Sequence, residues 1–391
     1  MDFTKLKAFM DFMARERTPG NAVAVYVNNE KVFSYTAGYS DLENQIPLTG
    51  DELYNLYSCS KVTTVTAGAQ LLEQGKILLS DPLYDYMPEF RRMNVRMEDG
   101  TVKEAQRPIT VGDLFSMTAG FDYDFGRECF QKARELTNGT MDTVQTFRCL
   151  AEEPLAFEPG SRWQYSMCHD VLAALISVVS GKKFREYVRE NIFEPLDMQD
   201  ACYHHTPETL RRTAEQYRFI PDGEATVDIV TAQQRGTKST GHFKNVGKEN
   251  SHVLGPEFDS GGAGVICSVM DYAKLASALA CGGVGPSGER ILSPYTIDLM
   301  RTNRLNEVQL TQFRWEQLRG CGYGLGVRTH MDPAASGLVC SLGEFGWGGA
   351  AGASIISDPK TGLGVFYAQH TLSPREEYYQ PRLRNVVYTC L

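Results

Sequence analysis

The chain has 391 residues, enough to bury a large core, so we expect one large domain or two domains in close contact. Its formal net charge of −9, from 39 basic and 48 acidic residues, argues against non-specific nucleic-acid binding, and no nucleic-acid partner is expected. No apolar run approaches the roughly 18 residues that a membrane span requires, so no membrane partner is expected either.

The cysteines and the N-terminus indicate the compartment. Ten cysteines are scattered along the chain without a C-x-x-C pair, so we expect reduced and mostly buried thiols. A structural zinc site needs clustered ligands, which the sequence lacks, so no metal is predicted. Residues 1–17 mix charged and apolar side chains, unlike the uninterrupted apolar segment of a secretory signal. These features favour a cytoplasmic protein that uses no cofactor.

The first part of the chain predicts a helix, a hairpin and a second helix. The amphipathic pattern of residues 1–17 is typical of a helix that lies on a core. Residues 22–27 and 31–35 are rich in β-formers, and the turn residues between them predict a β-hairpin. A helix is then expected over residues 61–74, with a glycine directly after it.

The middle of the chain predicts helices separated by loops. Helices are expected over residues 109–115, 141–152 and 170–179. Residues 121–138 are rich in aromatic and charged side chains, and they fit a surface loop and a substrate-lining lid equally well. Residues 233–251 are polar and predict a long exposed loop.

The end of the chain predicts strands and a last helix. Strand-like runs are found at residues 322–327, 338–345, 353–357 and 364–369, and a helical run at residues 375–388. Because the early hairpin can pair with these late strands, we expect an α+β fold whose antiparallel sheet is flanked by N- and C-terminal helices. We expect an α/β domain of residues 1–75 and 255–391, an inserted, mainly helical domain of residues 76–254 with long loops, and the active site between them.

The segment Ser58-Cys59-Ser60-Lys61 indicates nucleophilic catalysis. Residues three apart on a helix are neighbours, so the Lys61 ammonium is expected beside the Ser58 hydroxyl. A serine hydroxyl needs an adjacent base to act as a nucleophile, and lysine can be that base. The S-x-x-K spacing also occurs at Ser180 and Ser357, but only the Ser58 copy opens a helix. The sequence therefore predicts Ser58 as the nucleophile and Lys61 as its activator.

Four segments resemble, in their order along the chain, the motifs of the serine β-lactamase and penicillin-binding-protein superfamily. They are residues 58–61, 109–120, 157–166 and 345–350. Within this superfamily the chain is most similar to the class C side, and in particular to the family VIII carboxylesterases. The resemblance covers nearly the whole chain and implies a β-lactamase/transpeptidase-like fold.

The resemblance implies a catalytic centre of Ser58, Lys61 and Tyr165, because the family's conserved tyrosine falls on Tyr165. Either Tyr165 or Lys61 takes the Ser58 proton, and the same group later activates the deacylating water. A phenol has a reference pKa of about 10, so Tyr165 acts as a base only if a cation such as Lys61 stabilises its phenolate. The implied oxyanion hole consists of the backbone N–H groups of Ser58 and Ala350.

Two departures from the class C pattern bear on the substrate. Met167 stands where these enzymes have an asparagine that contacts the substrate amide, and a thioether makes no such hydrogen bond. Trp347, Gly348 and Gly349 stand in place of the K-T-G motif, so an apolar wall replaces a cation and the glycines let a substrate approach the backbone. A literal K-T-G at residues 360–362 lies in a turn between two expected strands and is not assigned to the site.

Other aromatic and histidine residues are weaker candidates. Tyr123, Phe125 and Trp315 fit the lining of an apolar acyl pocket, and they fit ordinary packing at least as well. A Ser–His–Asp triad needs a placed histidine, for which His169 and His370 are available. The chain has no G-x-S-x-G elbow, so an α/β-hydrolase is not expected.

These features predict a serine hydrolase that cleaves carboxylic esters of small to medium acyl groups through an acyl-Ser58 intermediate, with a small-molecule ester or amide as its partner. The alternatives are a β-lactamase, a D-amino-acid peptidase or amidase, and an acyltransferase that uses the same centre. A non-catalytic penicillin-binding-like sensor is disfavoured because Ser58, Lys61 and Tyr165 are all present. The sequence does not determine the oligomeric state.

Overall fold

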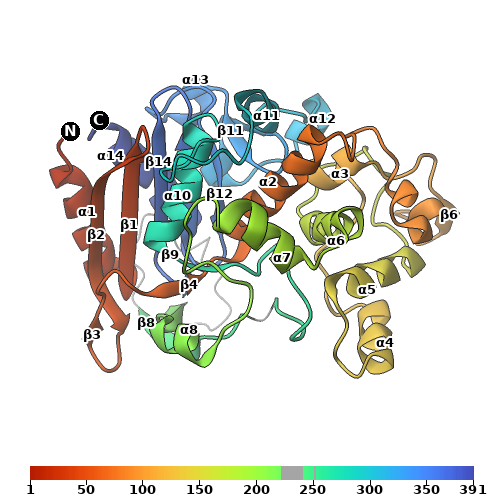
Figure 1. Ribbon diagram of the computed structural model, residues 1–391, viewed down its shortest axis with the longest axis horizontal. Helices are drawn as coiled ribbons and strands as arrows, with labels where there is room; N and C mark the ends of the chain where they lie inside the picture. Colours follow the sequence, from red (N-terminus) through yellow and green to blue (C-terminus); the bar gives the residue numbers. More distant parts are fainter. Residues whose placement is uncertain (222–240, 251) are drawn as a thin grey trace.

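An eight-stranded antiparallel sheet forms the core of the computed structural model, which describes residues 1–221, 241–250 and 252–391 (Figure 1). Its strand order is β10-β11-β12-β13-β14-β1-β2-β3, so the N-terminal hairpin joins the C-terminal strands. The strands are β1 (Gly20–Val27), β2 (Glu30–Asp41), β3 (Ile46–Pro47), β10 (Cys321–Tyr323), β11 (Arg328–His330), β12 (Phe345–Gly349), β13 (Ala353–Asp358) and β14 (Leu363–Ala368). The predicted α+β fold, with its sheet built from both ends of the chain, is confirmed.

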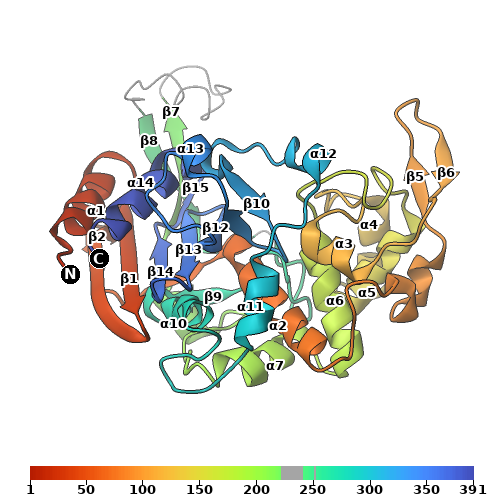
Figure 2. The same ribbon diagram turned by 90° about the horizontal axis from the view of Figure 1, so that it is seen from above.

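Helices cover both faces of this sheet. Alternate residues of β1 enter two different apolar clusters, as the period of two in a strand requires. Val23 and Val25 pack on the face covered by α1 (Thr4–Glu16) and α14 (Glu376–Tyr388). The other face packs against α10 (Val269–Ala280), as Figures 1 and 2 show. The predicted flanking of the sheet by the N- and C-terminal helices is therefore confirmed.

Two expected strands have different bounds in the structure. Over the run 338–345, the strand β12 begins only at Phe345, because Gly343 adopts a φ of 81° and turns the chain before it. The run 322–327 contains the end of β10 and then a turn before β11, in which Gly326 has a φ of 73°. Apolar composition alone does not reveal these turns.

The middle of the chain contributes a group of helices that lie beside the sheet (Figure 2). The further helices of the described residues are α2 (Ser60–Glu73), α3 (Val111–Ser116), α4 (Glu128–Leu136), α5 (Thr143–Arg148), α6 (Cys168–Ser180), α7 (Phe184–Val188), α8 (Pro207–Arg212), α11 (Pro294–Met300), α12 (Glu307–Leu310) and α13 (Pro333–Ser336). Smaller sheets pair β4 (Leu53–Asn55) with β9 (Ile266–Ser268), β5 (Asn94–Arg96) with β6 (Val102–Glu104), and β7 (Gln216–Pro221) with β8 (Gly241–Gly247) and β15 (Thr371–Leu372). None of the helices in the described ranges is long and apolar enough to cross a membrane.

Two segments expected as loops contain regular structure. The aromatic segment 121–138 includes α4, which packs part of its surface into the core. In the polar segment 233–251, residues 241–247 form the mostly exposed strand β8, whose backbone pairs with β7. Residues 233–240 and 251 of that predicted loop lie outside the described residues.

The helix α2 lies between the sheet and the helical region (Figure 2). It contacts β12 on one side and α6 on the other, and its residues from 60 to 71 are all buried. Gly75, with a φ of 65°, follows the helix as predicted. Because protein surrounds α2, the side chains at its first turn are held where sheet and helices meet. The bounds of the two predicted domains stay a prediction.

Candidate active site

The backbone turns sharply immediately before Ser58. Tyr57 begins the 3-10 turn Tyr57–Cys59 with a φ of 47°, in the left-handed region that side chains rarely adopt. Its ring is buried, and its hydroxyl donates a hydrogen bond of 2.9 Å to Oε1 of Gln216. Such strained residues persist where the surrounding structure holds them. The turn leaves the Ser58 side chain partly exposed at the start of α2.

Lys61 lies one turn further along and has no exposed surface. Its Nζ donates hydrogen bonds to Ser58 Oγ at 3.2 Å, to the Tyr123 hydroxyl at 3.2 Å and to the Gly262 carbonyl at 2.8 Å. These bonds match the three donors of an ammonium group. The structure thus places the Lys61 nitrogen beside the Ser58 oxygen, as the spacing predicts.

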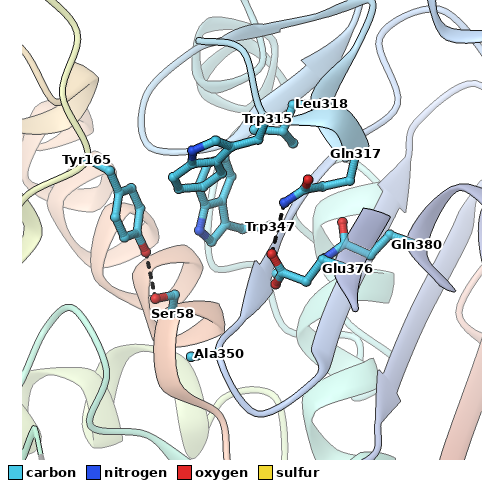
Figure 3. A pocket seen from close by; sticks show the side chains of 10 residues that line it. Ser58, Tyr165, Trp315, Gln317, Leu318, Trp347, Ala350, Glu376 and Gln380 are labelled. Carbon is cyan, nitrogen blue, oxygen red and sulfur yellow. Dashed lines mark hydrogen bonds between the residues drawn. The ribbon is translucent and has the colours of Figure 1, made fainter. Parts of the chain in front are cut away.

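Tyr165 reaches the same serine from the helical region (Figure 3). Its hydroxyl lies 2.6 Å from Ser58 Oγ, within hydrogen-bonding distance, and its ring centroid lies 4.6 Å from Lys61 Nζ. The ring stacks between those of Tyr123 and Trp347, at centroid distances of 5.5 and 5.9 Å. Ser58, Lys61 and Tyr165 therefore form one connected group.

The position of Tyr165 depends on two segments that the sequence resemblance singles out. Residues 109–120 and 157–166 lie side by side, and the N–H of Gln164 donates a hydrogen bond of 3.0 Å to the carbonyl of Met117. This bond fixes the backbone next to Tyr165. Two stretches that are separate in the sequence thus contact each other next to the site.

A buried carboxylate, that of Asp170, supports the position of Lys61 through the backbone of Gly262. Asp170 has no exposed surface, and its Oδ1 accepts hydrogen bonds from the Ser260 hydroxyl at 2.7 Å and the Gly262 N–H at 2.8 Å. A Cβ on Gly262 would lie 2.4 Å from Oδ2 of Asp170, so this contact requires glycine. Asp170 therefore positions the carbonyl to which Lys61 donates. The sequence analysis named its neighbour His169 but not this aspartate.

Burial keeps the groups around the centre neutral. It raises the pKa of the Tyr123 phenol well above its usual value. Burial, followed by the charge of Lys61, lowers the pKa of His252, and the same two causes lower the pKa of His169 to about 3. The Nε2–H of His169 donates to the Phe115 carbonyl at 3.1 Å. Within the described chain neither histidine bonds to the nucleophile, so no Ser–His–Asp triad forms there.

A cavity of about 170 Å³ opens beside Ser58 (Figure 3). The predicted site residues that line it are Ser58, Tyr165, Trp315, Trp347, Gly348 and Ala350. Its other lining residues, which the sequence analysis did not single out, are Gln317, Leu318, Glu376 and Gln380. Trp315 and Trp347 form an aromatic wall, and the Trp315 ring lies edge-on to Tyr165 at a centroid distance of 5.1 Å.

Four residues predicted to bind substrate lie outside this described lining: Tyr123, Phe125, Met167 and Gly349. Tyr123 contacts Lys61 instead, and the Phe125 ring packs edge-on against Tyr123 at 5.6 Å. Met167 is fully buried at the start of α6, where its N–H donates to the Asp122 carbonyl at 3.0 Å. Met167 therefore packs its side chain in the core, and its role toward a substrate stays a prediction.

Gly349 is the fourth such residue and brings β12 close to the nucleophile. A Cβ on Gly349 would lie 2.3 Å from the carbonyl oxygen of Leu56, two residues before Ser58. This glycine thus allows the strand and the turn to touch. The literal K-T-G at residues 360–362 lies in the turn that joins β13 to β14, as expected.

The remaining histidine candidate and the cysteines have structural surroundings. The Nε2 of His370 accepts the N–H of Asn55 at 3.3 Å, while its Nδ1 lies 2.9 Å from the Ala214 carbonyl. Each of the ten cysteines is unpaired, and most are buried. The described ranges contain no cluster of His, Cys, Asp or Glu that could hold a metal ion.

Glu376 is an acid within the cavity wall. Its Oε2 accepts a hydrogen bond of 2.9 Å from Nε2 of Gln317. Burial, followed by the charge of Glu377, raises the pKa of Glu376 to about 7. Glu376 and Gln380 are four residues apart on α14, so they occupy the same helix face. This spacing is a sequence signal, but it does not show what the face meets.

A family model described as Beta-lactamase matches residues 7–388 of the chain. The chain belongs to the β-lactamase family. Esterase EstB of Burkholderia gladioli is 28% identical over 380 residues, which cover 94% of this chain and 90% of EstB. The recognition of this superfamily from the ordered motifs is therefore confirmed.

Two solved structures share the fold over nearly the whole chain. EstCE1, described as a hydrolase with promiscuous acyltransferase activity, has a TM-score of 0.76 at 23% identity, covering 98% of this chain and 97% of EstCE1. A family VIII carboxylesterase has a TM-score of 0.75 at 21% identity, covering 100% and 97% of the two chains. The predicted β-lactamase/transpeptidase-like fold is confirmed, and the chain is a serine hydrolase of this family with esterase homologues.

Proposed function

We propose that this protein is a cofactor-independent carboxylesterase that cleaves esters of small to medium acyl groups through an acyl-Ser58 intermediate. The observation that carries the proposal is the contact of Ser58 Oγ with the Tyr165 hydroxyl at 2.6 Å and with Lys61 Nζ at 3.2 Å, beside an aromatic cavity. A serine oxygen between a proton acceptor and a cation is arranged for acyl transfer. The similarity to EstB supports an ester as the substrate.

Tyr165 is the proposed proton acceptor. Lys61 donates to the Gly262 carbonyl and has its three donors occupied, which suits an ammonium and leaves no lone pair for a proton. In the proposed step the phenolate form of Tyr165 takes the proton from Ser58 as Oγ attacks the acyl carbon. The same proton then passes to the departing alcohol. In deacylation Tyr165 takes a proton from water, which attacks the acyl carbon, and Ser58 recovers the proton as the acid leaves.

The backbone N–H groups of Ser58 and Ala350 are the proposed oxyanion hole. Both residues line the same cavity, and the close approach of Gly349 to Leu56 brings the end of β12 to the turn that holds Ser58. Two donors converging on the developing negative charge are the usual arrangement for acyl transfer. The first turn of α2 adds a favourable dipole.

An acyltransferase is the second candidate function. EstCE1 is described as a hydrolase with promiscuous acyltransferase activity, and an acyl-Ser58 group can pass to an alcohol as well as to water. β-Lactam or D-amino-acid amide hydrolysis is less well supported. Trp347 occupies the position of a cation that would hold a substrate carboxylate, and the acid Glu376 lines the same cavity.

The test is a burst assay with p-nitrophenyl acetate and p-nitrophenyl butyrate, combined with intact mass at short times. We expect a nitrophenol burst and an acyl adduct on the peptide that contains Ser58. Ser58→Ala abolishes both, whereas Ser180→Ala, at another S-x-x-K serine, leaves both unchanged. A wild-type protein without burst or adduct overturns the proposal. Assays with added alcohol distinguish acyl transfer from hydrolysis, because transfer yields a new ester product. A chromogenic cephalosporin tests β-lactam hydrolysis.

A cytoplasmic location belongs to the same proposal. Ten unpaired and mostly buried thiols suit a reducing compartment. Fractionation of the native source cells, with the protein detected by antibody, tests this location. Recovery outside the cytoplasmic fraction would contradict it.

A further inference from the structure

The cavity beside Ser58 carries an acid on the wall opposite Tyr165. In Figure 3 the rings of Trp315 and Trp347 lie between Tyr165 on one side and Glu376 on the other. Glu376 belongs to the first turn of α14, which covers the sheet, while Trp347 belongs to β12. Glu376 and Ser58 line the same cavity, although Ser58 precedes α2 and Glu376 lies on α14.

The carboxylate of Glu376 lies against the strand that carries the aromatic wall. A Cβ added to Gly348 would lie 2.9 Å from Oε1 of Glu376 and 2.4 Å from Nε2 of Gln380. Because the residue next to Trp347 is a glycine, both polar side chains can lie directly on the backbone of β12. The other carboxylate oxygen accepts the hydrogen bond from Gln317. These contacts hold the acid in place at the cavity.

Nothing positive faces this acid in the described part of the chain. The other lining residues include amides, tryptophans, a serine and a tyrosine, but no lysine or arginine, and no described ion pair involves Glu376. A carboxylate that is partly removed from water without a cationic partner is unfavourable. A bound cation would supply the missing partner.

The aromatic walls fit the same kind of ligand. Cations bind favourably over the faces of tryptophan and tyrosine, and cages of such faces recognise quaternary ammonium groups. Trp315, Trp347 and Tyr165 line the cavity together with Glu376. We propose that Glu376 makes this cavity selective for esters that carry an ammonium group and disfavours esters that carry a carboxylate. The substrate class rests on the proposed esterase function, because the cavity is the one beside Ser58.

The ionisation of Glu376 agrees with this assignment. Burial raises the pKa of the free carboxyl to about 7, so in the free protein the acid is held near its titration midpoint at neutral pH. A cation beside it favours the carboxylate, and its binding at this pH therefore releases a proton.

Binding of choline, without turnover, gives the first test. Titration calorimetry compares choline with 3,3-dimethylbutan-1-ol, its uncharged isostere. We expect wild-type protein to bind choline at least about tenfold more tightly than the isostere. Glu376→Gln removes this difference. Glu316→Gln removes the same charge from an exposed acid beside Gln317 and keeps the difference. Equal binding of both compounds to the wild type overturns the proposal.

Turnover of matched acetate esters gives the second test. The esters are 2-(trimethylammonio)ethyl acetate and 3,3-dimethylbutyl acetate, which differ in one charge. We expect the ratio of their kcat/KM values to favour the cation by about tenfold in the wild type and to approach one in Glu376→Gln. An unchanged ratio in Glu376→Gln overturns the inference. Failure to hydrolyse either ester counts against the esterase function, while the choline titration still decides the cation site.

Discussion

The hydroxyl of Tyr165 lies 2.6 Å from Oγ of Ser58, although 107 positions separate the two residues in the chain. Ser58 precedes α2 and Tyr165 precedes α6, and these two buried helices pack against each other. The short contact therefore depends on the packing of the core. A change that separates the two helices separates the nucleophile from its proposed base.

Tyr165→Phe tests the base directly. Removal of the phenol oxygen leaves the ring stack but no group to take the Ser58 proton. We expect kcat for p-nitrophenyl butyrate to fall by about 10²–10⁴, with little change in the circular dichroism spectrum. Tyr295→Phe, at a tyrosine that is 84% exposed, is the matched control and retains wild-type kinetics. Wild-type kcat in Tyr165→Phe would show that another group accepts the proton.

Asp170→Ala tests the support of Lys61. The variant loses two hydrogen bonds that hold the segment from Ser260 to Gly262, so we expect a loss of about 1–3 kcal/mol in the free energy of unfolding. The Lys61 nitrogen then loses its fixed carbonyl partner, and kcat falls more than KM changes. Asp170→Asn keeps an acceptor oxygen and is expected to recover part of kcat. Urea unfolding and steady-state kinetics measure both effects, and equal kcat in all three proteins would contradict the positioning role.

Two neighbouring glycines should respond differently to alanine. At Gly349 the new Cβ meets the backbone oxygen of Leu56 at 2.3 Å, which cannot move without shifting the turn before Ser58. We expect Gly349→Ala to lower the melting temperature and nearly abolish turnover. At Gly348 the Cβ meets the ends of the flexible Gln380 and Glu376 side chains, which can rotate away. Gly348→Ala should melt close to the wild type while losing cation preference. Identical behaviour of the two variants would refute this contrast.

The preference for a cationic ester should depend on pH. The ionisable groups around the Glu376 carboxyl are Glu377 and Tyr379 on its own helix, Cys59 of the 3-10 turn, and Tyr165 across the cavity. Burial keeps the thiol and the Tyr379 phenol protonated, so the Glu376 carboxyl determines the charge near pH 7.

Protonation below a pKa of about 7 removes the negative charge of Glu376, so the kcat/KM ratio of cationic to neutral acetate should fall as pH decreases through this value. Titration of the catalytic centre affects both esters equally, so it cancels in the ratio of their kcat/KM values. Measurement of this kcat/KM ratio from about pH 5 to about pH 9 tests the prediction. A ratio that stays constant, or one equally pH-dependent in Glu376→Gln, would contradict this prediction.

Glu376 should also lower stability at alkaline pH. Its pKa is raised from 4.5 to about 7 in the folded protein, so folding favours the protonated acid. Its unfavourable contribution is absent below about pH 4.5 and grows as pH rises to about 7. We expect Glu376→Gln to raise the free energy of unfolding by about 1–3 kcal/mol near pH 8, with no gain near pH 4.5. Thermal melts at both pH values check the sign, and a gain of the same size at both would contradict it.

Local patterns were sufficient for the core of the proposed site. The lysine of the motif lies three residues after Ser58, and a helix that starts there places the two side chains together whatever surrounds them. The β-forming residues of the hairpin, the turn residues between its strands and the strand-like runs near the C-terminus likewise predicted the sheet. Loops were harder to predict, because β8 is polar and exposed and becomes a strand through pairing with β7.

The sequence by itself determined the family, the sheet built from both ends of the chain, and the contact between Ser58 and Lys61, because these depend on ordered motifs and on short-range periodicity. Only the tertiary structure decided that Met167 packs in the core and that Glu376 enters the cavity wall. Those positions depend on which face of one element packs against another. Residue spacing within a single helix does not contain that information, whereas the packing of α6 and α14 against the core does.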